Sequence, residues 1–136
     1  MVEITATYEG ELRTSASHGP SGTVIETDAP VDNQGRGERY SPTDLVATAM
    51  GTCMMTIMGI YGQRHDMDLT GTKVRIEKHM TEELPRRIAR VVAEITVPLP
   101  EDHPRRRAIE KAAVNCPVFL SLHPEIEKPV VFAWVG

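Results

Sequence analysis

The seventeen residues 45–61 contain no charge and lie within the segment SPTDLVATAMGTCMMTIMGIYG at residues 41–62. Three features typical of a helix N-terminus precede it: Ser41 as a cap, Pro42 at the first helical position and Asp44 three residues after the cap. Large apolar side chains then recur around the whole circumference, which predicts a long helix buried on all sides. Such a helix has to lie at the centre of the fold.

Small residues occupy one face of this predicted helix, because Ala47, Gly51 and Gly59 are spaced at multiples of four. They allow another backbone to approach closely, and a second copy of the same helix is one candidate. The seventeen uncharged residues also approach the lower limit for crossing a bilayer. Three threonines and two glycines dilute their apolarity and no aromatic belt flanks them, so we expect no membrane association.

Size and composition are those of one soluble globular domain spanning residues 1–136, with 40% apolar and 25% charged residues. The net charge of −4 argues against general nucleic-acid binding. The first residues alternate in polarity and include Glu3, unlike a secretory leader. We therefore expect a cytoplasmic protein with no nucleic-acid partner, in a compartment where a permanent disulfide is rare.

Alternating polarity predicts several strands, and capping residues predict two further helices. The first three strands are separated by short turns and should form an antiparallel meander. The next two should form a hairpin with one face exposed to solvent. The expected strands span residues 2–8, 12–17, 23–27, 72–78, 88–97 and 130–135, and the expected helices 104–114 and 117–122. This order predicts an α+β fold.

A polar, glycine-rich loop, DNQGRGE at residues 32–38, leads directly into the central helix. Binding groups are commonly placed on loops held by a rigid scaffold, and this loop would bring Arg36 and Arg39 towards the helix start. Either arginine could equally be a solvated charge.

The chain has two cysteines, in contrasting sequence contexts. Cys53 lies in the apolar helix, where a small buried hydrophobe is the simplest interpretation. Cys116 precedes Pro117 and is predicted to cap a short helix, where unpaired N–H groups and the helix dipole favour the thiolate. The five histidines share no ligand spacing, and no phosphate-binding loop is present, so no metal or cofactor is expected.

The remaining constellation, two thiols and a nearby arginine, suits attack of a thiolate on a weak O–O or S–S bond followed by disulfide closure. An arginine stays charged when buried and offers five donors to the thiolate and to a peroxide oxygen. Asp44 lies nine residues before Cys53, off its face of the helix, but it could hold an arginine from the loop.

The motifs SPTDLVATAMGTC and VNCPV, in this order and context, resemble the OsmC/Ohr family of bacterial thiol peroxidases over essentially the whole chain. The resemblance implies antiparallel sheets wrapped around long central helices in an intertwined homodimer, with active sites at the subunit interface. It implies that Cys53 is the peroxidatic thiol, which forms a sulfenic acid on reducing a hydroperoxide, and that Cys116 is the resolving thiol. It also implies a dithiol or a lipoylated protein as reductant.

The sequence departs from the family pattern at the helix start. The best-known peroxidases of this family have a glutamate after the proline that pairs with the catalytic arginine, whereas this chain has Thr43 there and the acid follows as Asp44. For the arginine itself, Arg39 is the first choice, Arg36 the second and Arg13 the third.

Three hypotheses follow from these observations. The first is a two-cysteine peroxidase that prefers organic hydroperoxides, because methionines surround Cys53 in the sequence. The second is a dimer that senses redox state or binds a small apolar ligand without rapid turnover, and the third leaves both cysteines inert in the core.

Overall fold

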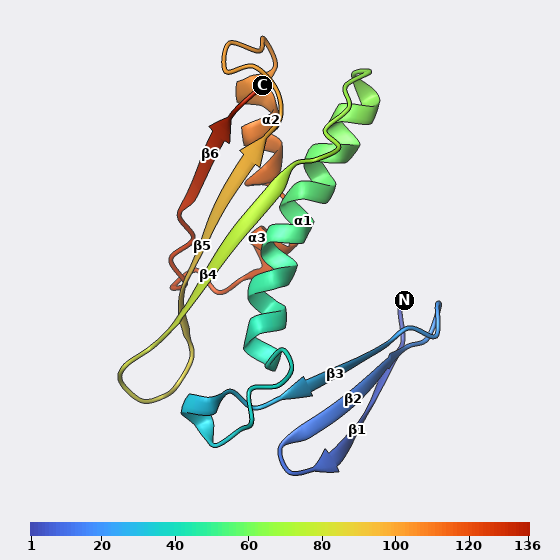
Figure 1. Cartoon of the computed structure of the whole chain (residues 1–136), viewed down its shortest axis with the longest axis vertical. Coiled ribbons are helices and arrows are strands. Elements are labelled where there is room, and N and C mark those ends of the chain that lie inside the picture. Colours follow the sequence, from blue (N-terminus) through green and yellow to red (C-terminus); the bar gives the residue numbers. More distant parts are fainter. The chain divides into compact units, whose positions relative to one another are not determined.

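A computed structural model describes all 136 residues and divides them into two compact units, residues 1–46 and 47–136. The boundary falls inside helix α1 (Pro42–Arg64), whose first residues belong to the first unit. Each unit has its own three-stranded sheet, and the α-helical residues lie mostly in the second unit (Figure 1). The α+β class predicted from the sequence is confirmed.

The first unit is an antiparallel meander with strand order β1-β2-β3, as predicted. A turn at residues 19–23 sets the register of the second hairpin, in which Ser17 lies opposite Val24 and Arg13 opposite Asp28. A short 3-10 helix, η1, follows in the loop that leads to α1. The bounds are Ile4–Gly10 for β1, Arg13–His18 for β2, Val24–Asp28 for β3 and Val31–Asn33 for η1.

The first unit has no hydrophobic core of its own. Its fully buried residues are Thr27, Asp28 and Ser41, all of them polar. Apolar side chains on its strands are exposed instead, such as Ile4 at 64% and Ile25 at 47%. A three-stranded sheet of this size is not stable in water without an apolar face that is covered.

The sheet of the second unit has the order β4-β5-β6 and mixes two kinds of pairing. β4 and β5 form the predicted antiparallel hairpin, whereas β6 pairs parallel to β5. Parallel pairing requires a crossover, and residues 98–129 supply it with helices α2 and α3. The bounds are Lys73–Met80 for β4, Ile88–Val97 for β5, Val130–Trp134 for β6, Arg106–Ala113 for α2 and Pro117–Ser121 for α3.

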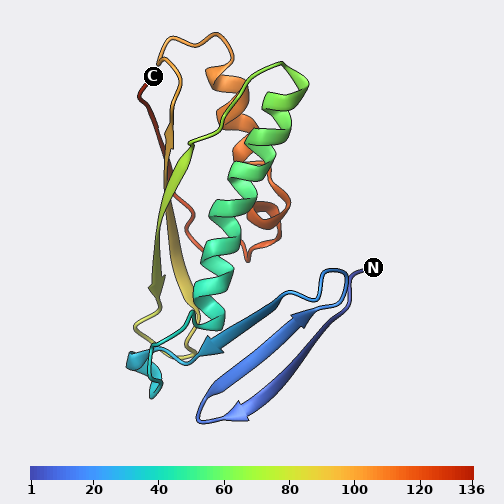
Figure 2. The ribbon, with the colours of Figure 1, turned by 45° about the vertical axis from the view of Figure 1, so that its right-hand side comes forward.

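Within the second unit, α1 and α2 lie on the same face of this sheet, as Figures 1 and 2 both show. Met50, Met54 and Met58, spaced by four, form the buried stripe of α1, with exposures of 0 to 1%. They belong to one apolar cluster with residues of β5 and α2, including Val91, Ala93, Ile95, Ile109 and Ala113. Burial of each methionine stabilises the fold by about 1.5–3 kcal/mol.

The prediction that α1 is buried on all sides is wrong for the single chain. Val46 and Ile60 are 37% and 39% exposed, and the side chains of Thr52 and Thr56 bond to backbone carbonyls of their own helix on the exposed face. A Cβ at Gly51 would lie 2.5 Å from the Ile76 side chain of β4. The close approach that this glycine permits is therefore made by the sheet, not by a second helix.

α1 is long and apolar enough to cross a membrane, with a mean hydropathy of 1.5 over its most apolar window. This is a weak indication, since the core helix of a soluble protein passes the same test. α2 begins at Arg106 instead of the predicted Pro104, because residues 103–105 form turns in which the Arg105 N–H donates to the ring of His103.

Candidate functional site

Cys53 occupies the middle of α1, and the start of that helix is fixed by a reciprocal cap. The Asp44 N–H donates to Ser41 Oγ at 3.0 Å, and the Ser41 N–H donates to Asp44 Oδ2 at 2.9 Å. The cap predicted at Ser41 is confirmed, and one Asp44 oxygen serves it. Cys53 follows nine residues later, half-buried, with its side chain packed against the core cluster.

Cys116 caps α3, as its sequence context predicts. Val114 is the C-cap of α2, Cys116 has an extended backbone conformation, and α3 begins at Pro117. Cys116 Sγ accepts a hydrogen bond from the Phe119 N–H at 3.3 Å. Its residue is 0% exposed, so the thiol lies wholly inside the second unit.

The fold brings the two cysteines together, although 63 positions separate them in the chain. Both are free thiols. Burial raises the pKa of the Cys116 thiol most strongly, the Phe119 N–H lowers it, and a hydrogen bond with Cys53 raises it further. The net pKa is higher than usual, so the expectation that the helix start favours a Cys116 thiolate is wrong: burial outweighs the donors of a five-residue helix.

The raised pKa of the Cys116 thiol predicts that the free energy of unfolding depends on pH. The Cys116 thiol binds its proton more tightly in the folded protein than in the unfolded chain, where the pKa of a cysteine is about 8.5. The contribution to the free energy of unfolding is therefore fully present below that pH and is lost as the pH rises above it. We expect urea unfolding from pH 7.5 to 10 to show a steeper decline for the wild type than for Cys116→Ala. Parallel declines would contradict this.

Both cysteines are associated with the apolar core of the second unit: Cys116 belongs to the core cluster and Cys53 packs against it. The cluster that contains Cys116 also includes Met54 of α1, and Ile57 of α1 and Phe119 of α3 pack against it. Val114, Val118 and Leu122 pack against the same cluster. The two thiols therefore lie in a largely apolar region of the fold.

The two arginines preferred from the sequence lie on the exposed surface of the first unit. Arg39 Nε is 3.0 Å from Glu26 Oε2, and both side chains are nearly half exposed. Arg36 pairs with Glu11 and is equally exposed. Ion pairs of this kind contribute little to stability.

Arg13, the third choice, is held far more firmly. Its guanidinium binds Asp28 through two hydrogen bonds of 2.7 and 3.0 Å and Glu38 Oε2 through a third of 2.9 Å. Asp28, only 2% exposed, also accepts from the Glu38 N–H at 3.1 Å. The Arg13 hydrogen bonds lower the pKa of Asp28. Our sequence reasoning missed Asp28 and Glu38; Asp28 is opposite Arg13 only in the observed register of β2 and β3, which the structure supplied.

Substitution of Asp28 by asparagine is expected to loosen the first unit, because the Arg13 guanidinium would lose its buried counter-charge. A carboxylate whose pKa is lowered stabilises the fold above its ordinary pKa of about 3.9, and this contribution is lost as the pH falls below it. We expect faster amide hydrogen exchange in β2 and β3 of Asp28→Asn at pH 6 and no difference near pH 2. Glu38→Gln, at a 55% exposed side chain, is the matched control and should change exchange less.

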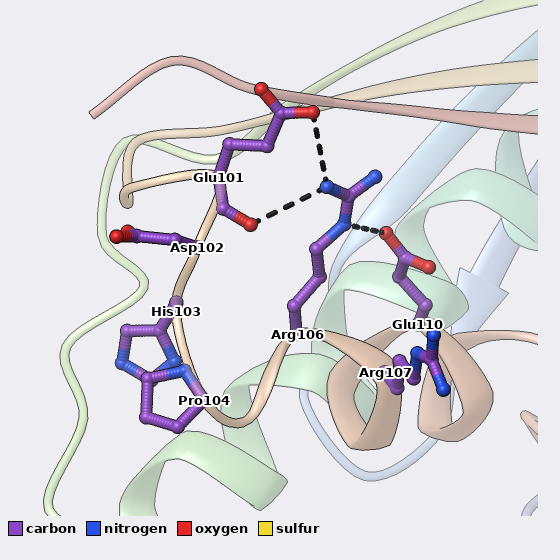
Figure 3. Close-up of a pocket in the computed structure, with 7 residues that line it drawn as sticks. All are labelled: Glu101, Asp102, His103, Pro104, Arg106, Arg107 and Glu110. Atoms are coloured by element: carbon purple, nitrogen blue, oxygen red, sulfur yellow. Dashed lines mark hydrogen bonds and ion pairs between the residues drawn. The ribbon is translucent and has the colours of Figure 1, made fainter.

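A separate pocket of about 500 Å³ lies at the start of α2 (Figure 3). Arg106 crosses it, with hydrogen bonds to Glu101 and to Glu110 Oε1, the latter at 3.0 Å. Glu110 Oε1 also accepts from the Trp134 indole at 2.8 Å, so these charges tie α2 to β6. The pocket is lined by Glu101, Asp102, His103, Pro104, Arg106, Arg107 and Glu110. Nowhere in the chain do three or more His, Cys, Asp or Glu side chains gather in a way that could hold a metal ion.

The fold and the thiol pair define an α+β protein with two interacting cysteines, one on a long apolar helix and one at the start of a short helix. A family model described as OsmC-like protein matches residues 35–128. The chain therefore belongs to the OsmC-like family, and the resemblance seen in the sequence is confirmed.

Solved structures agree with this assignment. A Psychrobacter arcticus protein, provisionally named for the osmotic stress induced and detoxification response, is 43% identical with a TM-score of 0.91, over 97% of this chain and 96% of that one. An organic hydroperoxide resistance protein OsmC from Legionella pneumophila is 12% identical with a TM-score of 0.77, over 98% and 96%. One from Elizabethkingia anophelis is 17% identical with a TM-score of 0.79, over 99% and 96%. The latter two show a shared fold alone. No curated protein matches the chain significantly.

Proposed function

We propose that this protein is a two-cysteine, thiol-dependent peroxidase that reduces organic hydroperoxides. The observation that carries the proposal is the thiol pair: half-buried Cys53 and wholly buried Cys116 are both free and interact directly. A transient catalytic or sensing disulfide is the usual role of such a pair in a reducing compartment, and we propose the cytoplasm.

The reaction requires three steps. The Cys53 thiolate attacks one peroxide oxygen and breaks the O–O bond, which leaves Cys53 as a sulfenic acid and releases an alkoxide that takes a proton to become the alcohol. The Cys116 thiol then attacks the sulfenic sulfur, forming the Cys53 to Cys116 disulfide and releasing water. A dithiol or lipoylated protein reduces this disulfide and is itself oxidised by two electrons.

The apolar setting supports organic over inorganic peroxides. The core cluster shared by the two thiols contains Met54 and is packed by Ile57 and Phe119, side chains that offer hydrogen peroxide few hydrogen-bonding groups. They would instead bury an alkyl or aryl group, at about 25 cal/mol for each Å² removed from water. Two similar structures are those of organic hydroperoxide resistance proteins, which agrees with this preference.

We propose that the protein is a homodimer, in the intertwined form that the resemblance implies. The first unit has no buried hydrophobic residue, and its strands expose Ile4, Tyr8 and Ile25. On α1, Val46 and Ile60 are also exposed. A second copy of the chain would cover such surfaces, and light scattering after size exclusion should give twice the mass of one chain. A monomeric mass at micromolar concentration would contradict the proposal.

The accessory residues are also a proposal. The resemblance implies an arginine that supports the thiolate and an acid that holds it, for which Arg39, Arg36 and Asp44 are the sequence-based candidates. The firm hold of Asp28 and Glu38 on Arg13 favours Arg13 as the pre-organised member of the set. Replacing Arg13, Arg36 and Arg39 singly by methionine should identify the one whose loss lowers kcat/KM.

A second candidate function is a redox-sensing or ligand-binding dimer without rapid turnover. Two observations favour it: Thr43 stands where the resemblance implies glutamate, and an oxygen of Asp44 is used by the helix cap. In that case peroxide would oxidise the thiol pair slowly and no catalytic cycle would follow.

Peroxide consumption separates the two candidates. Purified protein stripped of metal should consume cumene or t-butyl hydroperoxide with dithiothreitol over many turnovers. Stoichiometric oxidation followed by arrest, with dithiothreitol still present, would favour the sensing role. Absence of any oxidation would contradict both.

A further inference from the structure

The crossover between β5 and β6 contains the same local structure twice. The dipeptide His-Pro occurs at residues 103–104 and again at residues 123–124. In both places the ring Nδ1 of the histidine accepts a hydrogen bond from the backbone N–H two residues later, that of Arg105 or Glu125, at 3.1 Å. The histidine carbonyl accepts from the N–H three residues later, at 3.0 Å in both. We refer to these structures as the two His-Pro turns.

The two His-Pro turns lie at the ends of the helical part of the crossover. Helices α2 and α3 are between them, and so is Cys116, which is 0% exposed. The first turn contacts β6, because the His103 ring stacks on Trp134 with 6.4 Å between the ring centroids. The second leads to β5, where the Glu127 N–H donates to the Ala89 carbonyl at 3.0 Å. The turns therefore fix both ends of the segment that carries Cys116.

Each ring can accept this hydrogen bond only while its Nδ1 carries no proton. The donor is a backbone N–H, so the ring must be the neutral tautomer with its proton on Nε2. Imidazoles ordinarily gain a second proton as the pH falls through about 6.5, and both ring nitrogens are then donors. His103 is half-buried and His123 is exposed, so solvent reaches both. Protonation would place one N–H against another and break the bond.

We propose that the two His-Pro turns make the crossover sensitive to pH: neutral rings hold it closed around Cys116, and protonation of both rings loosens it in mildly acidic solution. This inference goes beyond the proposed peroxidase function and does not depend on it. Loss of one net hydrogen bond shifts a local opening equilibrium by roughly two- to tenfold.

The charged side chains near the rings largely balance one another. Those that line the pocket beside His103 are Glu101, Asp102, Arg106, Arg107 and Glu110 (Figure 3). Arg106 binds two of the three carboxylates, so the charges that remain are those of Asp102 and Arg107. At the second turn, the Glu125 carboxylate pairs with Arg87 at 3.6 Å. The response to pH is therefore set chiefly by the backbone N–H that each ring accepts.

Nuclear magnetic resonance tests both requirements. At pH 7.5 the ring nitrogens of His103 and His123 should show the Nε2–H tautomer. Hydrogen exchange, corrected for the intrinsic rate at each pH, should show that protection of the Arg105 and Glu125 amides falls at least about threefold from pH 7.5 to pH 5.5, with no such fall in β4. An Nδ1–H tautomer in either ring, constant protection at the turns or an equal fall in β4 would overturn the proposal.

Chemical labelling tests the consequence for Cys116. The background is Cys53→Ser, where Cys116 is the one thiol, and the reagent is 4,4′-dithiodipyridine, which reacts with thiols in acid. The matched variant adds His103→Asn and His123→Asn, because the asparagine oxygen can accept the same N–H but does not titrate.

Labelling of Cys116 at pH 5.5 should be at least about fivefold faster with the histidines than with the asparagines, and at pH 7.5 the two rates should agree within about twofold. Comparison at one pH cancels the intrinsic reactivity of thiol and reagent. Replacement of both histidines by alanine, which removes the acceptors, should give fast labelling at both pH values. Equal rates for histidine and asparagine at pH 5.5 would overturn the proposal.

Discussion

Replacement of Cys53 by serine is expected to lower the reduction of cumene hydroperoxide by at least about 10³-fold, the scale seen when a catalytic nucleophile is removed. A serine hydroxyl does not ionise near neutral pH and cannot form a sulfenic acid, so the first step has no nucleophile. Cys53 is half-buried and its side chain packs on the core, so the nearly isosteric serine should leave the fold intact. Coupled consumption of peroxide and dithiothreitol measures the change.

Cys116→Ser is the matched control for this variant. It should still form one equivalent of sulfenic acid on Cys53, detectable with dimedone by mass spectrometry, because Cys116 acts only in the second step. Dimedone labelling of Cys116 in the Cys53→Ser variant, together with retained turnover, would show that the roles of the two thiols are reversed.

Truncation of Met54 to alanine is expected to lower the free energy of unfolding by about 2–5 kcal/mol. The Met54 side chain is 0% exposed and packs within the cluster that joins α1 to β5 and α2. Its removal loses apolar burial and leaves a cavity that Met50 and Met58, held in the same stripe, cannot fill without distorting the helix. Urea unfolding of the wild type and the variant measures the difference.

Two variants on the same helix show whether packing is the cause. Met54→Leu nearly conserves volume and should cost less than about 1.5 kcal/mol. Thr52→Ala, on the exposed face, should change stability by no more than about 0.5 kcal/mol. A loss at Thr52 as large as that at Met54 would show that burial in the core cluster does not account for the effect at Met54.

Much of the fold could be predicted from local patterns in the sequence. The Ser41 cap, the meander, the hairpin and the terminal strand depend on residues close together in the chain, so they could be predicted. The parallel pairing of β6 with β5 could not be predicted, because its partners are separated by the whole crossover. The burial of a single face of α1 was missed for a similar reason. When apolar residues occur all around a helix, the sequence does not show which face packs against the rest of the chain.

The candidate site shows the same division. The sequence by itself singled out the two candidate residues, Cys53 and Cys116, because the apolar helix and the Asn-Cys-Pro-Val turn are local patterns. Only the tertiary structure decided that the thiols meet, that Cys116 is the inaccessible one with a raised pKa, and that Arg13 is the firmly held arginine. Access and desolvation depend on what packs around a group, and that packing is assembled from distant parts of the chain.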